Sequence, residues 1–156
     1  MADAGLLARL GEVLAAELPI TQSLGIRVES RSGGSLVLWL PLAANRNHKG
    51  AVFAGSLNAV ATLAGWGALW LALAEAGAEA HVVIQDSTIR YPRPARSDVL
   101  ATCAGPVPAA LEQALDLLRR RGRARLALAS EVHDAEGTPV ARFAGRYVLH
   151  RPGAFG

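Results

Sequence analysis

The stretch "NRNHKGAVFAGSLNAVATLAGW", residues 45–66, begins with polar residues and glycine and turns into an apolar run. No Asp, Glu, Lys or Arg occurs between residues 51 and 74. A run of this length predicts either a membrane span or a helix buried in a protein core. It contains Ser56, Asn58 and Thr62, and the segments on both sides alternate as strands do. We therefore expect no membrane span but a central helix from about residue 55 to residue 76.

The flanking segments predict an antiparallel sheet around that helix. Residues 23–42, "SLGIRVESRSGGSLVLWLPL", are typical of two strands joined by a glycine turn. Two strands in residues 81–105 and the hairpin "RARLALASEVHDAEGTPVARFAGRYVLH" follow the helix. One amphipathic helix comes before the first strand, and another, "PAALEQALDLLRRRG", is inserted among the later strands. The prediction is a single α+β domain over residues 1–156, with six antiparallel strands wrapped around one helix.

Composition excludes several classes of protein. Cys103 is the one cysteine of the 156 residues, which excludes an internal disulfide framework and a cysteine-based zinc site. We expect it to be a small buried residue, and its isolation fits a reducing cytoplasm. We predict no metal and no cofactor.

The net charge is +3, and eight of the arginines fall into two groups, residues 90–96 and 119–125. Neither group has the alternation of basic and aromatic residues that is typical of nucleic-acid binding, so we expect no such partner. Each group is either a solvated face or a docking surface for an acidic partner or a phosphate-bearing ligand.

Several motifs occur in an order that resembles one family. They are "LPITQSLGIRV", "NHKGAVFAGSL", "LAGW", "DSTIRYPRP" and "GRARLALASEV", spread over roughly residues 18–150. The arrangement is similar to the hotdog fold, and the motifs resemble its YiiD C-terminal-domain branch of thioesterase-like proteins. The resemblance implies a homodimer whose two sheets join, or a higher oligomer, with active sites at the interface. It also implies an acyl group carried as a thioester on acyl carrier protein or coenzyme A.

The start of the central helix is the predicted centre of the chemistry. Backbone N–H groups near Gly55 have no helical partner and can form an oxyanion hole. In similar thioesterases an acid about two turns into the helix activates water, but the alignment of the Asn-x-x-Gly loop places Thr62 there. A threonine hydroxyl cannot deprotonate water at neutral pH, which argues against hydrolysis.

Decarboxylation of a malonyl thioester needs no base, because the substrate brings its own negative charge. Neutral donors then stabilise the enolate, and a nearby carboxylate would repel the substrate. The resemblance implies this reaction as well, because some members of the similar branch are implicated in malonyl-acyl-carrier-protein decarboxylation, and the missing acid favours it over hydrolysis. We therefore predict a malonyl-acyl-carrier-protein decarboxylase, a lyase linked to fatty acid biosynthesis. Its predicted catalytic residues are Asn47, Ser56 and Thr62, with Gly55 as oxyanion hole. The predicted substrate-binding residues are Asn45, His48, Phe53, Asn58, Asp86, Arg93 and Arg96.

Structural explanations stay open for these residues. Asn47 can stabilise a turn, Ser56 can cap the helix, and Thr62 can bond its own backbone one turn back. Two other functions also stay open. One is an acyl thioesterase that uses His48 or Asp86 with a water molecule. The other is a module that binds acyl thioesters without turnover.

Overall fold

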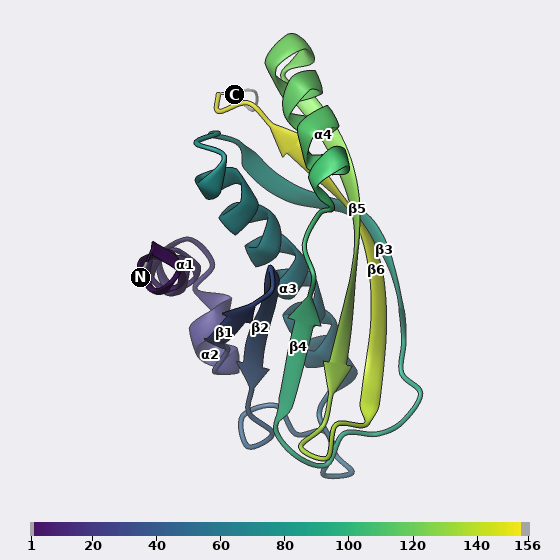
Figure 1. Ribbon diagram of the computed structural model, residues 1–156. Helices are drawn as coiled ribbons and strands as arrows, with labels where there is room; N and C mark the ends of the chain where they lie inside the picture. Colours follow the sequence, from purple (N-terminus) through teal and green to yellow (C-terminus); the bar gives the residue numbers. More distant parts are fainter. Residues whose placement is uncertain (1, 154–156) are drawn as a thin grey trace.

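The computed structural model describes residues 2–153 as an antiparallel sheet wrapped around a long helix (Figure 1). The sheet has six strands in the order β1-β2-β4-β5-β6-β3. The strands are β1 Arg27–Ser32, β2 Ser35–Leu40, β3 His81–Arg90, β4 Val99–Cys103, β5 Arg123–His133 and β6 Pro139–His150. The helices are α1 Ala2–Glu17, α2 Ile20–Leu24, α3 Ala54–Glu75 and α4 Pro108–Arg121. The predicted α+β hotdog arrangement is confirmed, with α1 as the extra first helix and α4 inserted between β4 and β5.

Helix α3 forms the centre of the core because most of its 22 residues are small or apolar and buried. A side chain at Gly65 would overlap the Tyr147 hydroxyl, and one at Gly67 would come within 2.6 Å of the Leu36 side chain. The two glycines therefore allow the sheet to approach the helix on both sides. By length and composition α3 could cross a membrane, but 67% of its most apolar window is buried inside the protein. It is the core helix that the sequence predicted.

The two predicted hairpins are present. Gly33 and Gly34, both with positive φ, join β1 to β2, and a turn that includes Gly137 joins β5 to β6. Along β6 the apolar side chains of Phe143 and Tyr147 face α3 and are buried, as the alternation predicts. The short helix α2 was not predicted, because Pro19 marks the end of the first helix and gives no sign of a second.

Strand β3 departs from simple alternation. Its pairing with β6 shifts between Ile84 and Asp86, which inserts Gln85 as a bulge. Asp86 therefore lies opposite the exposed Arg146, on the face of the sheet that points away from α3. The other side of β3 has no neighbouring strand in the described chain, and Val83 and Ile84 are 42% and 36% exposed there.

Two contacts fix how β3 runs relative to α3. The Tyr91 hydroxyl, just after β3, donates to the Ala54 carbonyl at the start of α3 at 3.3 Å. Farther along the helix, the Trp66 indole nitrogen donates to the Val82 carbonyl near the start of β3 at 2.9 Å. The end of β3 thus lies beside the start of α3, and the start of β3 lies beside the second half of α3 (Figure 1).

Candidate functional site

The start of α3 presents two backbone donors without partners. Phe53 stands at the N-cap with an extended backbone and makes no side-chain cap. Its carbonyl accepts from the N–H groups of Ser56 at 3.0 Å and Leu57 at 3.1 Å. The N–H groups of Ala54 and Gly55 precede the first helical hydrogen bond and have no acceptor in residues 2–153. Both residues are exposed, so the pair forms an accessible site of partial positive charge.

The Phe53 ring lies against this first turn. A Cβ added to Gly55 would overlap the ring, so glycine is what lets the ring take this position. Phe53 is 56% exposed, which leaves the ring free to move aside for a ligand. Phe53 therefore supplies an apolar wall next to the two N–H groups.

Ser56 is not the N-cap of α3, although the sequence left that role open. It lies inside the first turn, it is buried, and no side-chain hydrogen bond caps this helix. Its hydroxyl forms no hydrogen bond with other described residues, and its oxygen is not fully enclosed. The residue is 4% exposed, so only a small part of Ser56 is open to a ligand beside Ala54 and Gly55.

Two asparagines hold the loop before the helix. The Asn47 side-chain oxygen accepts from the N–H groups of Lys49 at 2.9 Å and Ala51 at 3.1 Å, which leaves its amide nitrogen available. Asn45 is buried, and its amide donates to the Leu24 and Pro41 carbonyls, each at 2.8 Å.

The backbone carbonyl of Asn45 also accepts from Phe53 N–H at 2.7 Å. Asn45 thus sets the position of the first turn of α3 through its side-chain amide and its backbone carbonyl. This positioning role was missed, because the sequence around Asn45 looks like any polar loop.

Asn58 and Thr62 follow Gly55 on one half-buried stripe of α3. The Thr62 hydroxyl donates to the Asn58 side-chain oxygen at 3.4 Å. The expected bond from Thr62 to its own backbone is therefore replaced by a bond between two side chains. The first acidic residue of α3 is Glu75 in its last turn, so this stripe has only neutral polar groups.

The predicted charged residues lie in three different places. Asp86 is on the outer face of the sheet, where the Arg146 guanidinium holds the pKa of its carboxyl below the ordinary value. A carboxylate in that setting is a weaker base and does not face the start of α3 in its own protomer. Arg96 donates to the Lys49 carbonyl of the asparagine loop at 3.2 Å. Arg93 and His48 are exposed and make no side-chain hydrogen bond or ion pair with other described residues.

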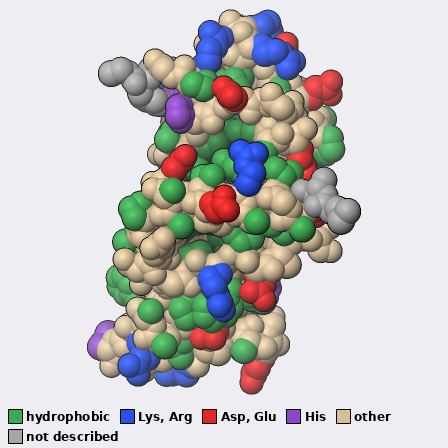
Figure 2. All heavy atoms as spheres, turned by 90° about the vertical axis from the view of Figure 1, so that its left-hand side faces the viewer, with side chains coloured by type: hydrophobic (Ala, Val, Ile, Leu, Met, Phe, Trp, Pro, Cys, Tyr) green, Lys and Arg blue, Asp and Glu red, His purple; other side chains and the backbone are tan. Residues whose placement is uncertain are grey.

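A groove of about 870 Å³ runs beside the second half of α3, between α1 and the start of β3. Trp66, Trp70 and Val82 line it, and the Arg9 guanidinium lies 5.8 Å from the centre of the Trp70 ring. Figure 2 shows the hollow and its hydrophobic lining on the face that carries α1. The same helix therefore has a polar surface at its start and an apolar groove beside its second half.

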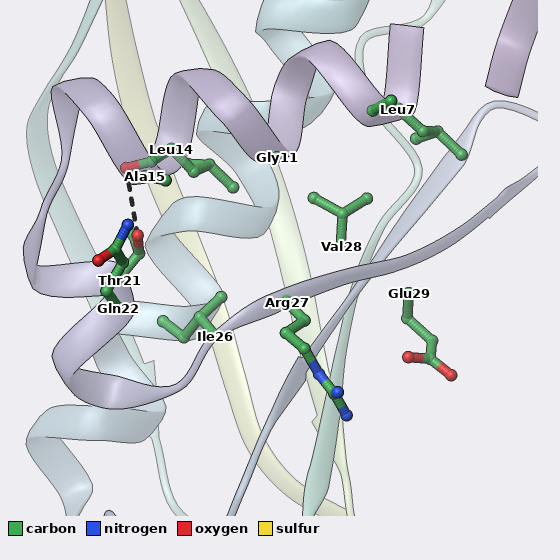
Figure 3. Close-up of a pocket in the computed structure, with 11 residues that line it drawn as sticks. Leu7, Gly11, Leu14, Ala15, Thr21, Gln22, Ile26, Arg27, Val28 and Glu29 are labelled. Carbon is green, nitrogen blue, oxygen red and sulfur yellow. Dashed lines mark hydrogen bonds between the residues drawn. The ribbon is translucent and has the colours of Figure 1, made fainter. Parts of the chain in front are cut away.

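A smaller groove of about 370 Å³ lies between α1, α2 and β1 (Figure 3). Leu7, Gly11 and Val28 border it, and the Thr21 hydroxyl is occupied by the Leu14 carbonyl at 3.2 Å. No residue of α3 or of the asparagine loop lines it. It is therefore separate from the two N–H groups at the start of α3.

Comparisons with known proteins agree with this architecture. Residues 7–151 match the family described as "Putative thioesterase (yiiD_Cterm)". A solved structure of a protein of unknown function from Chlorobaculum tepidum TLS is similar, with 28% identity, a TM-score of 0.90 and 96% of each chain covered. A "putative thioesterase" from Shewanella oneidensis has 29% identity and a TM-score of 0.85, over 96% of this chain and 99% of its own. A "Probable Thioesterase" from Pseudomonas aeruginosa has 26% identity and a TM-score of 0.76, over 92% and 94%.

The family match covers most of the chain, and the alignments with the similar structures cover nearly the whole length of both chains. Both findings confirm the resemblance that the motifs indicated, and they confirm the hotdog fold. The chain therefore belongs to the yiiD C-terminal-domain family of thioesterase-like proteins, a family that acts on acyl thioesters.

Proposed function

We propose that the protein decarboxylates a malonyl thioester to the acetyl thioester at the start of α3. One observation carries the proposal: two unpaired backbone N–H groups lie on a helix face that has no carboxylate. The N–H groups of Ala54 and Gly55 suit a developing oxyanion. The neutral side chains of Asn58 and Thr62 suit a substrate that is itself an anion.

In the proposed reaction the bond between the malonyl carboxylate and the adjacent carbon breaks, and carbon dioxide leaves. The bonding electrons form an enolate whose oxygen accepts from the Ala54 and Gly55 N–H groups. Such donors contribute about 2.7–4 kcal/mol each to the lowering of a barrier in well-studied enzymes. The enolate carbon then takes a proton from water, and the thioester stays intact. Thr62 acts as a positioning residue, because its bond to Asn58 leaves the Asn58 amide nitrogen free to donate.

We propose further that the protein works as a homodimer joined through β3. This edge strand is ten residues long, unpaired on one side, and exposes Val83 and Ile84. An exposed edge of this kind is a template for another strand. A two-fold axis perpendicular to the sheet would pair β3 with its copy in antiparallel fashion and keep both α3 helices on one face.

Hydrolysis is the second candidate, and the family description favours it. It needs a base near the oxyanion hole, and His48 in the exposed loop or a group from the partner subunit would have to supply it. A module that binds thioesters without turnover is the third candidate. The three differ in product and not in fold.

Mass spectrometry of malonyl-acyl carrier protein after incubation with the enzyme separates the candidates. Loss of the mass of carbon dioxide with the thioester intact is the expected result. Release of the free carrier thiol would contradict decarboxylation and support hydrolysis. Saturable binding with no change in mass would support the binding module. An Asn58→Ala variant should slow the reaction and keep the fold, because Asn58 is half-buried and, among the described residues, its side chain bonds only to Thr62.

A further inference from the structure

Five arginines gather where α4 ends and β5 begins: Arg119, Arg120, Arg121, Arg123 and Arg125. All five are exposed. Gly122, with φ 72°, closes the helix in a left-handed turn and lets β5 begin one residue later. Figure 2 shows basic side chains gathered at this end of the molecule, over α4. These five residues are called the arginine patch below.

The patch carries positive charge that its surroundings do not balance. Arg120 pairs with Asp116 at 2.7 Å, and Arg125 bonds to the neutral Gln85 side chain at 2.8 Å. Arg119, Arg121 and Arg123 form no ion pair with any carboxylate of residues 2–153. The field also reaches His150 in the adjacent strand, where burial lowers the imidazole pKa and the charges of Arg123, His81 and Arg125 lower it further.

The backbone beneath the patch is tied down. The Arg151 guanidinium donates to the last carbonyls of α4, those of Leu118 at 3.2 Å and Arg119 at 3.0 Å. Its backbone N–H donates to the Gly122 carbonyl at 3.0 Å. Basic residues at a helix end stabilise its dipole, but Arg123 and Arg125 belong to a strand and need another explanation. A fixed frame with several unpaired guanidinium groups suits an extended acidic surface.

The patch lies far from the site in its own protomer. It is next to the start of β3, since Arg123 and His81 both pair with His150. The start of β3 is beside the second half of α3, whereas the two N–H groups are at the first turn. A helix of 22 residues is about 33 Å long, so the patch and its own site lie near opposite ends of the molecule.

Antiparallel pairing of β3 with its copy changes this relation. The start of β3, at His81, would lie beside the end of β3 in the partner subunit, at Arg90. In each protomer Tyr91 follows that end and contacts Ala54 at the start of α3. The patch of one protomer would therefore stand next to the site of the other.

We propose that the arginine patch docks an acidic carrier protein, whose thioester arm then enters the site of the partner subunit. The inference rests on the proposed acyl-thioester chemistry and on β3 pairing, and it selects the patch over Arg93 and Arg96 as the protein-docking group. Arg96 is already engaged with the Lys49 carbonyl, close to the mouth of its own site. A carrier protein is favoured over coenzyme A because the charges are spread over a helix and a strand.

The first test measures binding of holo-acyl carrier protein, so it does not depend on turnover. Arg121→Glu/Arg123→Glu should raise the Kd about tenfold or more at low salt, with a smaller difference at high salt. The matched control Arg9→Glu/Arg142→Glu makes the same change in net charge elsewhere and should leave the Kd within about twofold. Equal effects of the two variants would overturn the proposal. So would binding of a DNA duplex as tight as that of the carrier, because it would mark a general polyanion surface.

The second test asks which subunit receives the arm. Cys103 is buried, so Asn58→Cys adds one reactive thiol at the site. A carrier whose arm ends in a pyridyl disulfide would exchange with this thiol and release pyridinethione. Mixed dimers are made with Arg121→Glu/Arg123→Glu in one chain and an intact arginine patch in the other. Cross-linking should be fast when Asn58→Cys is on the Arg121→Glu/Arg123→Glu chain, because the intact patch of the partner then delivers the arm. It should be slow when Asn58→Cys is on the chain with the intact patch.

The reverse order of rates would show docking and entry in the same subunit and overturn the proposal. Equal rates would remove the patch from docking altogether. Failure of mixed dimers to form would also overturn it, because no partner site would exist. None of these results depends on whether the enzyme decarboxylates or hydrolyses its substrate, so the proposed function can fail while the docking proposal survives.

Discussion

The two halves of α3 have opposite surroundings. The first half begins at Ala54 and Gly55 with N–H donors that no group in residues 2–153 satisfies, and Asn58 and Thr62 follow on the same stripe. In the second half, buried apolar residues such as Leu71 pack into the core, and Glu75 in the last turn forms an ion pair with Arg31. One helix thus joins a reactive end to a packed end.

The difference shows how the fold can keep unsatisfied donors in place. Free N–H groups at a helix start cost stability unless the rest of the helix is strongly held. Burial of the second half supplies that hold, and the loop bond from Phe53 to Asn45 supports the first turn. Changes at buried positions such as Leu71 should therefore alter stability, while changes on the exposed first turn and at Asn58 should alter chemistry.

The largest effect should come from Leu71→Ala, in the packed half. Leu71 is fully buried, so its loss should lower the free energy of unfolding by about 2–5 kcal/mol. Urea unfolding measures it, and Ile20→Ala on the exposed surface should change the value by less than about 0.5 kcal/mol. A similar loss for both variants would contradict the division between a packed half and a reactive half.

The next effect concerns the reactive half. Gly55→Pro removes one unpaired N–H from the first turn, where proline is tolerated, and should slow the reaction by about 10²–10³-fold with little loss of stability. Gly55→Ala is the control, because it brings the same Cβ toward the Phe53 ring and keeps the N–H. The measurement is the steady-state rate of each variant. A similar loss of rate in the two would show that contact between the new Cβ and the Phe53 ring, and not the missing N–H, slows the reaction.

The third prediction concerns a negative charge placed on the neutral stripe of α3 formed by Asn58 and Thr62. Asn58→Asp keeps the shape and adds a carboxylate beside an anionic substrate, so it should slow decarboxylation about tenfold more than Asn58→Ala does. Product analysis of both variants is the measurement. If Asn58→Asp instead gained hydrolysis and lost nothing, the argument from the neutral stripe would be wrong.

A smaller effect should follow from Tyr147→Phe, where the halves meet. The Tyr147 hydroxyl donates to the Thr62 carbonyl at 2.6 Å inside the core. Its loss should lower stability by about 0.5–1.5 kcal/mol, because the carbonyl keeps its helical partner. Thermal unfolding measures the change, and an equal change for an exposed hydroxyl, Ser32→Ala, would show that the contact contributes nothing.

The smallest effect belongs to the anchor between Glu75 and Arg31. The bond to Arg31 holds the pKa of Glu75 below its ordinary value of 4.5, against the opposite effect of burial. A lowered pKa stabilises the fold above the unfolded-state value, and that stability is lost as the pH falls through the folded-state value. Wild type should therefore exceed Glu75→Gln in stability at neutral pH and approach it below about pH 4. A gap that persists in acid, or the same behaviour in Glu12→Gln, would contradict this role.

Much of this organisation could be predicted from the sequence by local rules. An uncharged run from residue 51 to residue 74 between alternating segments can only be a buried helix or a membrane span, and the flanks decide for the first. The glycine turns of both hairpins and the small residues of α3 follow from steric rules that act within a few residues. The lack of an acid on the reactive stripe is likewise visible from helical spacing alone.

Tertiary structure decided what local rules cannot reach. A one-residue bulge turned Asp86 to the outer face, and a shift in strand register leaves no mark in the sequence of the strand itself. Asn45 acquired its role from carbonyls 21 and 4 residues away, and Ser56 became buried because its side of the helix meets the core. The separation of the arginine patch from the reactive end depends on the path of α4 and β5. Such long-range placement comes from packing, which no window of neighbouring residues encodes.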